Sequence, residues 1–321
     1  MKTFFDKNIL VTGGTGFVGS HLVEELVKEG AHVITTYQTL NRQSYFFTRN
    51  LESKVLMVGA DVCNFQQIFN IVTKNNVEYV FHLAAQPLVE PAYYNPQQTL
   101  YTNVLGTVNV LESVRLFPKI KGLVVASSDK AYGKLAKKKY TETDDLRGDH
   151  PYEVSKSAAD LISSAYFKTY GIPVVTTRFG NIFGEGDLNF SRIVPGIMKS
   201  IINDEKLILR SNGKYIRDYL YVKDVVRGYL LLVKNIKQTR GEAFNFGSRE
   251  TLSVFDLINI VQKKLGKKVN YKIIDTAKNE IPYQSHNYNK IWKKLGWQPQ
   301  HSLSSTIDQI AGWYKNHLEY E

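Results

Sequence analysis

Two side chains placed four residues apart could together remove a proton from an alcohol. Tyr152 and Lys156 belong to a segment, 152–170, whose pattern predicts a helix, so the phenol and the ammonium fall on one face. A cation next to a phenol favours the phenolate, which would allow Tyr152 to act as a general base near neutral pH. A tyrosine and a lysine at this spacing also occur by chance, and the pair gains weight only from the residues that precede it.

Three consecutive polar residues stand where a predicted buried strand, 122–128, ends: Ser128 is its last residue, and Asp129 and Lys130 follow it. Open α/β sheets bind ligands at the carboxyl ends of their strands, which is where Ser128, Asp129 and Lys130 would lie. Ser128 could hydrogen-bond a substrate hydroxyl and lower the cost of a developing oxyanion. Asp129 and Lys130 add a carboxyl and an amine, suited to giving and accepting a proton. Taken alone, a surface turn with a solvated ion pair explains these residues better.

A glycine-rich segment, 12–19 (Thr-Gly-Gly-Thr-Gly-Phe-Val-Gly), directly follows the predicted strand Asn8–Thr12 and opens a helical pattern. Glycines let the backbone turn tightly and approach a pyrophosphate, which binds to the N–H groups at the helix N-terminus. An ordinary glycine-rich turn is the alternative, but the strand before and the helix after favour a dinucleotide. The expected cofactor contacts in this segment are Gly13, Gly16, Phe17, Val18 and Gly19.

The cofactor preference is less sharply defined. The acidic residue that usually contacts the adenosine ribose about 20 residues further on is missing. The second predicted strand, 31–37, is followed by Gln38, and Arg42 nearby could receive a 2′-phosphate. We expect NAD and leave NADP open. Asp61 is a candidate contact for the adenine, with a simple strand-end cap as its alternative.

Strand and helix patterns alternate over about 180 residues, which predicts an α/β fold with a doubly wound parallel sheet. The expected strands are 8–12, 31–37, 55–62, 79–85, 122–128 and 173–179, and the expected helices include 66–74, 96–117 and 152–170. We assign residues 1–180 to a dinucleotide-binding domain, to which 224–233 return. Residues 181–321 mainly form a smaller substrate lobe, with helices at 191–203 and 253–265 and a strand at 242–246.

Composition limits the class of protein. The chain has 321 residues, 43% of them hydrophobic and 22% charged, which excludes a disordered chain. Cys63 is the only cysteine, so neither an internal disulfide nor a thiolate zinc site is expected; we expect no metal and a cytoplasmic location. No apolar run reaches the roughly 20 residues of a membrane span, and the early glycine motif predicts no signal peptide. The net charge of +11 alone does not distinguish nucleic acid, membrane or phosphorylated substrate.

Together these motifs resemble the extended short-chain dehydrogenase/reductases that act on nucleotide sugars. The resemblance rests on the glycine motif, His82-Leu-Ala-Ala85, Asn103, the strand end at Ser128 and the Tyr152/Lys156 pair, and it extends through 178–184 and 217–224 to 295–297. Ser-Asp-Lys-Ala-Tyr-Gly at 128–133 and Ala-Ala-Gln-Pro-Leu-Val at 84–89 look most like the CDP-glucose 4,6-dehydratase group. The Asp-Lys pair also occurs in dehydratases that act on UDP-N-acetylglucosamine, so it fixes neither base nor sugar.

The resemblance implies roles for individual residues. Tyr152 would take the proton of the sugar C4 hydroxyl with help from Ser128, Asp129 would protonate the leaving C6 hydroxyl, and Lys130 is our candidate for abstracting the C5 proton. The implied cofactor contacts are Asp61, Val62, Leu83, Ala84, Ala85, Asn103, Tyr152 and Lys156. The implied substrate contacts are Gln86, Ser128, Tyr152, Asn181, Arg192 and Arg217, with the two arginines near the nucleotide and pyrophosphate.

Other functions use the same residues. A nucleotide-sugar 4-epimerase or a 4-ketosugar reductase would use Ser128, Tyr152 and Lys156 in the same way. A non-catalytic dinucleotide sensor or a nucleic-acid-binding protein is a remote alternative supported only by the charge. We expect a nucleotide-diphosphate sugar as the partner and neither nucleic acid nor membrane. The family also implies a homodimer through the helices 96–117 and 152–170, whose alternative is full burial within the monomer.

Overall fold

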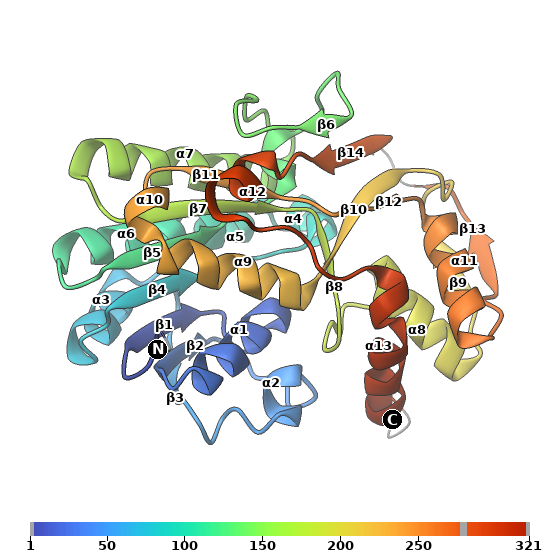
Figure 1. Ribbon diagram of the computed structural model, residues 1–321, viewed down its shortest axis with the longest axis horizontal. Coiled ribbons are helices and arrows are strands. Elements are labelled where there is room, and N and C mark those ends of the chain that lie inside the picture. The colour runs from blue at the N-terminus through green and yellow to red at the C-terminus, as the bar shows by residue number, and fades with distance from the viewer. Residues whose placement is uncertain (1–2, 277–280, 319–321) are drawn as a thin grey trace.

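A seven-stranded parallel sheet forms the centre of the computed structural model, which describes residues 3–276 and 281–318 (Figure 1). Its strand order is β11-β7-β5-β4-β1-β2-β3. The strands are β1 (Asn8–Thr12), β2 (His32–Tyr37), β3 (Leu56–Gly59), β4 (Tyr79–His82), β5 (Gly122–Ala126), β7 (Val174–Phe179) and β11 (Ala243–Phe246). The doubly wound sheet that the alternating pattern predicts is therefore confirmed.

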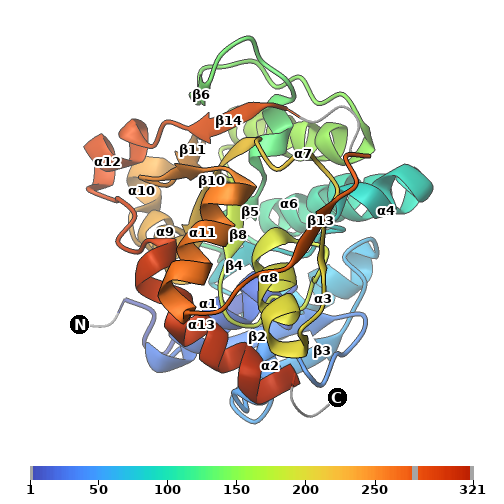
Figure 2. The same cartoon turned by 90° about the vertical axis from the view of Figure 1, so that its right-hand side faces the viewer.

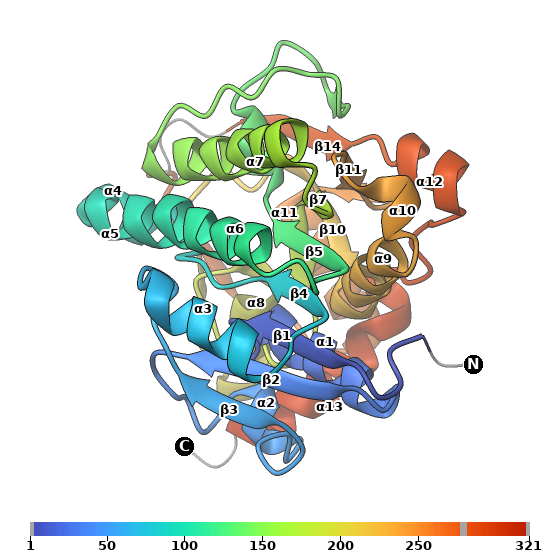
Figure 3. The ribbon, with the colours of Figure 1, turned by 90° about the vertical axis from the view of Figure 1, so that its left-hand side faces the viewer.

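Helices cover both faces of this sheet, so nearly all residues of its inner strands β1, β4, β5 and β7 are buried. In β1, Ile9 and Val11 pack toward α1 (Phe17–Lys28) and α9 (Val222–Lys234). Leu10, which points the other way, packs in the cluster formed with the helices of the opposite face. Those helices are α3 (Phe65–Lys74), α6 (Gly106–Leu116) and α7 (Pro151–Tyr170) (Figure 3).

The segment 96–117, expected as one helix, contains a wider turn. It consists of α5 (Pro96–Leu100), a π-helical turn at Tyr101–Leu105 and α6. Such turns are frequent at functional sites, and this one carries Asn103. The short helices that complete this domain are α2 (Tyr45–Thr48), α4 (Val89–Tyr94) and α10 (Ile236–Thr239).

A smaller lobe is built around a second sheet of order β12-β10-β14-β6, with β8 also paired to β10 (Figure 2). Its strands are β6 (Lys139–Tyr140), β8 (Asn181–Phe183), β10 (Ile216–Tyr221), β12 (Thr251–Leu252) and β14 (Tyr283–His286). The helices α8 (Ile193–Asn203), α11 (Val254–Leu265) and α13 (Leu303–Leu318) share a separate core, and β9 (Leu207–Leu209) pairs with β13 (Tyr271–Ile273). The helix α12 (Asn289–Leu295) follows β14.

Two segments that follow residue 181 in the sequence lie on the first domain. Residues 224–233, expected to return to it, belong to α9, which packs against α1 and β5. The strand at 242–246, which we expected in the second lobe, is instead β11 and completes the edge of the main sheet beside β7. That expectation was wrong because the local pattern of a strand does not tell which sheet it joins.

Candidate active site

The glycine segment forms a cradle that a side chain would fill. Gly13 has φ +71°, and a Cβ there would lie 2.8 Å from the backbone nitrogen of Ala84. A Cβ at Gly19 would lie 2.2 Å from the carbonyl oxygen of Gly13. The helix α1 begins within this segment, at Phe17, and no described side chain caps its N-terminus. This end of the helix therefore fits a pyrophosphate, as the sequence predicts for a dinucleotide.

The end of β4 lies against this cradle. The backbone N–H of Leu83 donates to the carbonyl of Thr12 (3.1 Å), and that of Ala84 donates to the Thr12 hydroxyl (3.2 Å). The Thr12 hydroxyl also hydrogen-bonds His82 Nδ1 at 2.8 Å. Burial lowers the pKa of His82 to about 3, so this imidazole is neutral and has a structural role. Leu83, Ala84 and Ala85 are thus brought next to the glycine segment.

Asp61 and Val62 follow β3 and make local contacts. Asp61 Oδ1 accepts the backbone N–H of Cys63 at 2.8 Å, which is the strand-end cap considered as the alternative. The Val62 carbonyl accepts the Asn109 amide of α6 at 2.9 Å. Contact of either residue with the adenine of a cofactor stays a prediction.

The predicted catalytic residues converge where β5 ends. Ser128 precedes a 3₁₀ turn, Asp129–Tyr132, against which α7 packs. The side chain of Tyr152 on α7 hydrogen-bonds Ser128, whose hydroxyl donates to Asp129 Oδ1 at 2.8 Å. Lys156, one helical turn further on, donates from Nζ to the carbonyl of Ala126 at 3.0 Å. A phenol, a hydroxyl and a carboxyl therefore form one connected group.

Burial controls the protonation of this group. It raises the pKa of Tyr152 to about 12, although the hydrogen bond with Ser128 acts in the opposite direction. Burial also lowers the pKa of Lys156 to about 8. The phenolate expected near neutral pH is therefore not favoured in this state, because desolvation outweighs the stabilising contacts. Tyr152 is therefore mainly a protonated phenol in this state, and its minor phenolate form is the one that could act as a base.

Asp129 and Lys130 share a partner that sequence reasoning missed. Gln284 of β14 accepts a hydrogen bond from Lys130 Nζ at 3.1 Å and donates from Nε2 to the Asp129 carbonyl at 3.2 Å. A glutamine 154 residues away in an irregular part of the chain carries no signal that could have identified it.

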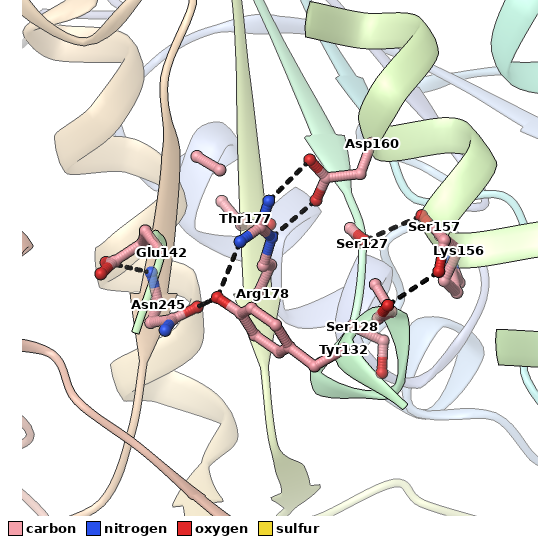
Figure 4. Close-up of polar contacts among 12 residues, drawn as sticks. Ser127, Ser128, Tyr132, Glu142, Lys156, Ser157, Asp160, Thr177, Arg178 and Asn245 are labelled. Atoms are coloured by element: carbon pink, nitrogen blue, oxygen red, sulfur yellow. Dashed lines mark hydrogen bonds and ion pairs between the residues drawn. The ribbon is translucent and has the colours of Figure 1, made fainter. Parts of the chain in front are cut away.

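A buried hydrogen-bond network anchors the turn (Figure 4). Arg178 of β7 makes two hydrogen bonds to Asp160 of α7, at 2.7 and 2.9 Å, and a third to the Tyr132 hydroxyl at 2.7 Å. That hydroxyl donates to Asn245 Oδ1 of β11 at 2.7 Å. The sheet and α7 therefore hold Tyr132, the last residue of the turn that also carries Asp129 and Lys130, in place.

Asn103 connects two parts of the site. Its Oδ1 accepts the backbone N–H of Gln86 at 2.8 Å, and its Nδ2 donates to the Ser155 hydroxyl of α7 at 2.9 Å. The Gln86 side chain accepts the N–H of Leu88 at 3.2 Å. Asn103 thus holds the loop after β4 against α7.

The three residues assigned to the nucleotide and phosphates of the substrate come from the second lobe. Arg192 precedes α8 and forms an ion pair with Asp187 at 3.2 Å, and its charge partly opposes the rise that burial causes in the pKa of Tyr152. Arg217 of β10 is buried and donates to the Ile216 carbonyl at 2.8 Å. Asn181 is exposed at the start of β8. Their contacts with substrate stay predictions.

Neither a metal-binding cluster nor a membrane-spanning helix is present in residues 3–276 and 281–318. No group of three or more histidine, cysteine, aspartate or glutamate side chains there could hold a metal ion. None of the helices in these ranges has the length and apolar character needed to cross a membrane.

Comparisons with known proteins identify the family of the chain. The family model described as GDP-mannose 4,6 dehydratase matches residues 10–310. CDP-glucose 4,6-dehydratase of Salmonella typhimurium is 31% identical over 98% of this chain and 92% of its own length. The structure of UDP-glucose 4-epimerase from Thermotoga maritima, solved with UDP-glucose, covers 97% of this chain and 99% of its own, with a TM-score of 0.88 and 28% identity. That of dTDP-glucose 4,6-dehydratase from Streptomyces venezuelae, solved with NAD, covers 98% of both chains, with a TM-score of 0.88 and 25% identity. The chain therefore belongs to the GDP-mannose 4,6 dehydratase family, within the extended short-chain dehydrogenase/reductases.

Proposed function

We propose that this protein is a nucleotide-sugar 4,6-dehydratase that converts an NDP-hexose resembling CDP-glucose into the 4-keto-6-deoxy product. The observation that carries the proposal is the placement of Asp129 and Lys130 beside Ser128 and Tyr152 on one anchored turn. Oxidation of C4 alone needs only the serine, tyrosine and lysine set. The additional carboxyl and amine are the groups that an elimination requires.

The chain's own residues would divide the reaction as follows. The phenolate form of Tyr152, produced when the phenol loses its proton to solvent, accepts the proton of the C4 hydroxyl. Ser128 hydrogen-bonds the same oxygen, which becomes the 4-ketone. This ketone acidifies C5–H, so Lys130 accepts the C5 proton and Asp129 donates a proton to the C6 hydroxyl, which leaves as water. When bound in the glycine cradle, NAD supplies a hydride acceptor for C4 and a hydride donor for C6. C5 regains its proton at the end, so the cofactor is regenerated in each cycle.

NAD is the proposed cofactor because relatives were crystallised with it and the cradle fits a pyrophosphate. The guanidinium of Arg42 lies 4.6 Å from the centre of the Phe47 ring. Because it is a cation close to the end of β2, it could receive the 2′-phosphate of NADP, which therefore stays the alternative cofactor.

The decisive test is incubation with a panel of nucleotide hexoses followed by mass spectrometry. We expect the loss of one water without net consumption of NADH. Asp129→Asn and Lys130→Ala are expected to lower dehydration by roughly 10²-fold or more while C4 oxidation is retained, because general acid and base each contribute about 10²–10⁴-fold. Asp145→Asn and Lys134→Ala, in the loop that follows, are matched controls expected to behave like wild type. Dehydration at the wild-type rate in both active-site variants would disprove the assignment.

A 4-epimerase is the second candidate, favoured by the structural likeness to the Thermotoga maritima enzyme. It would yield an isomer of unchanged mass in the same assay, and a 4-ketosugar reductase would consume reduced cofactor.

We also propose that the enzyme is a homodimer through α4–α7, which lie side by side on one flank (Figure 3). Full burial of these helices within the monomer was the alternative considered from the sequence, but large apolar side chains on them are exposed. These are Tyr93, Tyr94, Leu100, Tyr101, Leu105, Leu116, Val154, Leu161 and Tyr170. Light scattering should give about twice the 36.6 kDa of one chain. Leu161→Asp should produce the monomer, and Ile208→Asp, at an exposed apolar residue of the other lobe, should not. A monomeric wild-type protein would contradict the proposal.

A further inference from the structure

Gln284 bridges both residues assigned to the elimination. It lies on β14 of the second lobe and is 1% exposed, although its side chain ends in a polar amide. Its two amide atoms are both used at the active-site turn: the oxygen accepts from Lys130 Nζ (3.1 Å) and the nitrogen donates to the carbonyl of Asp129 (3.2 Å). One side chain therefore restrains the candidate base and the backbone of the candidate acid.

The strand that carries Gln284 is fixed to the strand that carries Arg217. In the register of β10 and β14, Arg217 and Gln284 are paired directly. Two residues further along β14, the backbone N–H of His286 donates to Asp218 Oδ2 of β10 at 2.6 Å, and the His286 ring contacts the same oxygen at 2.9 Å. The side chains of His286 and Asp218 are both buried. Gln284 is consequently held by the same strand pair that presents the proposed pyrophosphate ligand.

We propose that Gln284 is a positioning residue for the elimination. Its side chain holds the Lys130 amine at a fixed position relative to β10, the strand that carries the proposed pyrophosphate ligand Arg217. This inference rests on the proposed dehydratase function. A neutral amide oxygen suits the task, because it fixes the position of the lysine nitrogen without the added stabilisation of the ammonium that a carboxylate would give. A base must be neutral when it accepts a proton, so a glutamate at this position would oppose the step that the glutamine permits.

Two substitutions separate positioning from general support of the fold. Gln284→Leu keeps the volume and removes both hydrogen bonds, whereas Gln284→Glu keeps an acceptor for Lys130 and makes it anionic. We expect dehydration to fall by about tenfold to a hundredfold in Gln284→Leu, in line with the cost of a misplaced catalytic group, and further in Gln284→Glu. KM and the single-turnover rate of nicotinamide reduction should stay within about threefold of wild type, because C4 oxidation does not use Lys130. Ser285→Ala, the neighbour on the opposite face of β14, is the matched control.

The outcomes are distinct. Wild-type dehydration rates in both Gln284 variants would overturn the inference while leaving the proposed function intact. Parallel losses of thermal stability, NAD affinity and nicotinamide reduction would also overturn it, because they identify a purely structural residue. If wild-type enzyme reduces its nicotinamide with a nucleotide hexose but never releases water, the proposed function itself fails, and the inference fails with it.

Discussion

Replacing Tyr152 with phenylalanine is expected to slow C4 oxidation by about a thousandfold, within the roughly 10²–10⁴-fold contribution of a general base. The substitution removes the hydroxyl that hydrogen-bonds Ser128 and keeps the buried ring. The measurement is the single-turnover reduction of bound nicotinamide after mixing with a nucleotide hexose. Tyr170→Phe, at the exposed end of the same helix, should oxidise substrate at the wild-type rate. A rate within tenfold of wild type in Tyr152→Phe would mean that another group takes the proton.

The pH dependence of the same step has a definite sign. Burial raises the pKa of Tyr152 to about 12, so the phenolate is the minor form throughout the neutral range. Its population increases as the pH rises toward that pKa. The wild-type oxidation rate should therefore increase with pH between about 6 and 9, and Tyr152→Phe should lose this increase.

The second large effect is expected on stability. Replacing Asp160 with alanine leaves the Arg178 guanidinium buried without its carboxylate, a loss that costs about 3–5 kcal/mol when a buried ion pair is broken. Both residues are 4% exposed, and two hydrogen bonds join their side chains. The free energy of unfolding from urea titrations is the measurement. Because Arg178 also bonds Tyr132, the folded fraction of the variant should also show a slower dehydration.

The chain offers a matched control for this prediction. Asp145 and Arg147 form an ion pair whose side chains are 69% and 67% exposed. Asp145→Ala should change the free energy of unfolding by less than about 1 kcal/mol, because water screens the pair. Equal effects of the two alanine substitutions would show that the buried pair does not anchor the turn.

Local sequence patterns determined the main sheet and the cofactor cradle. Apolar strand segments and helical repeats are periodic over short distances, and the glycines of 12–19 act through their own backbone. For the same reason the spacing of Tyr152 and Lys156 was sufficient to place both on one face of α7. The order of Ser128, Asp129 and Lys130 after β5 also needed no distant information.

What only the tertiary structure decided depends on groups that are far apart in the chain. β11 completes the main sheet from position 243, Arg178 meets Tyr132 across 46 residues, and Gln284 meets Lys130 across 154. The protonation of Tyr152 was misjudged for the same reason. Its pKa follows from burial and from the contacts that the fold assembles around it, and no spacing in the sequence records how far water is excluded from a side chain.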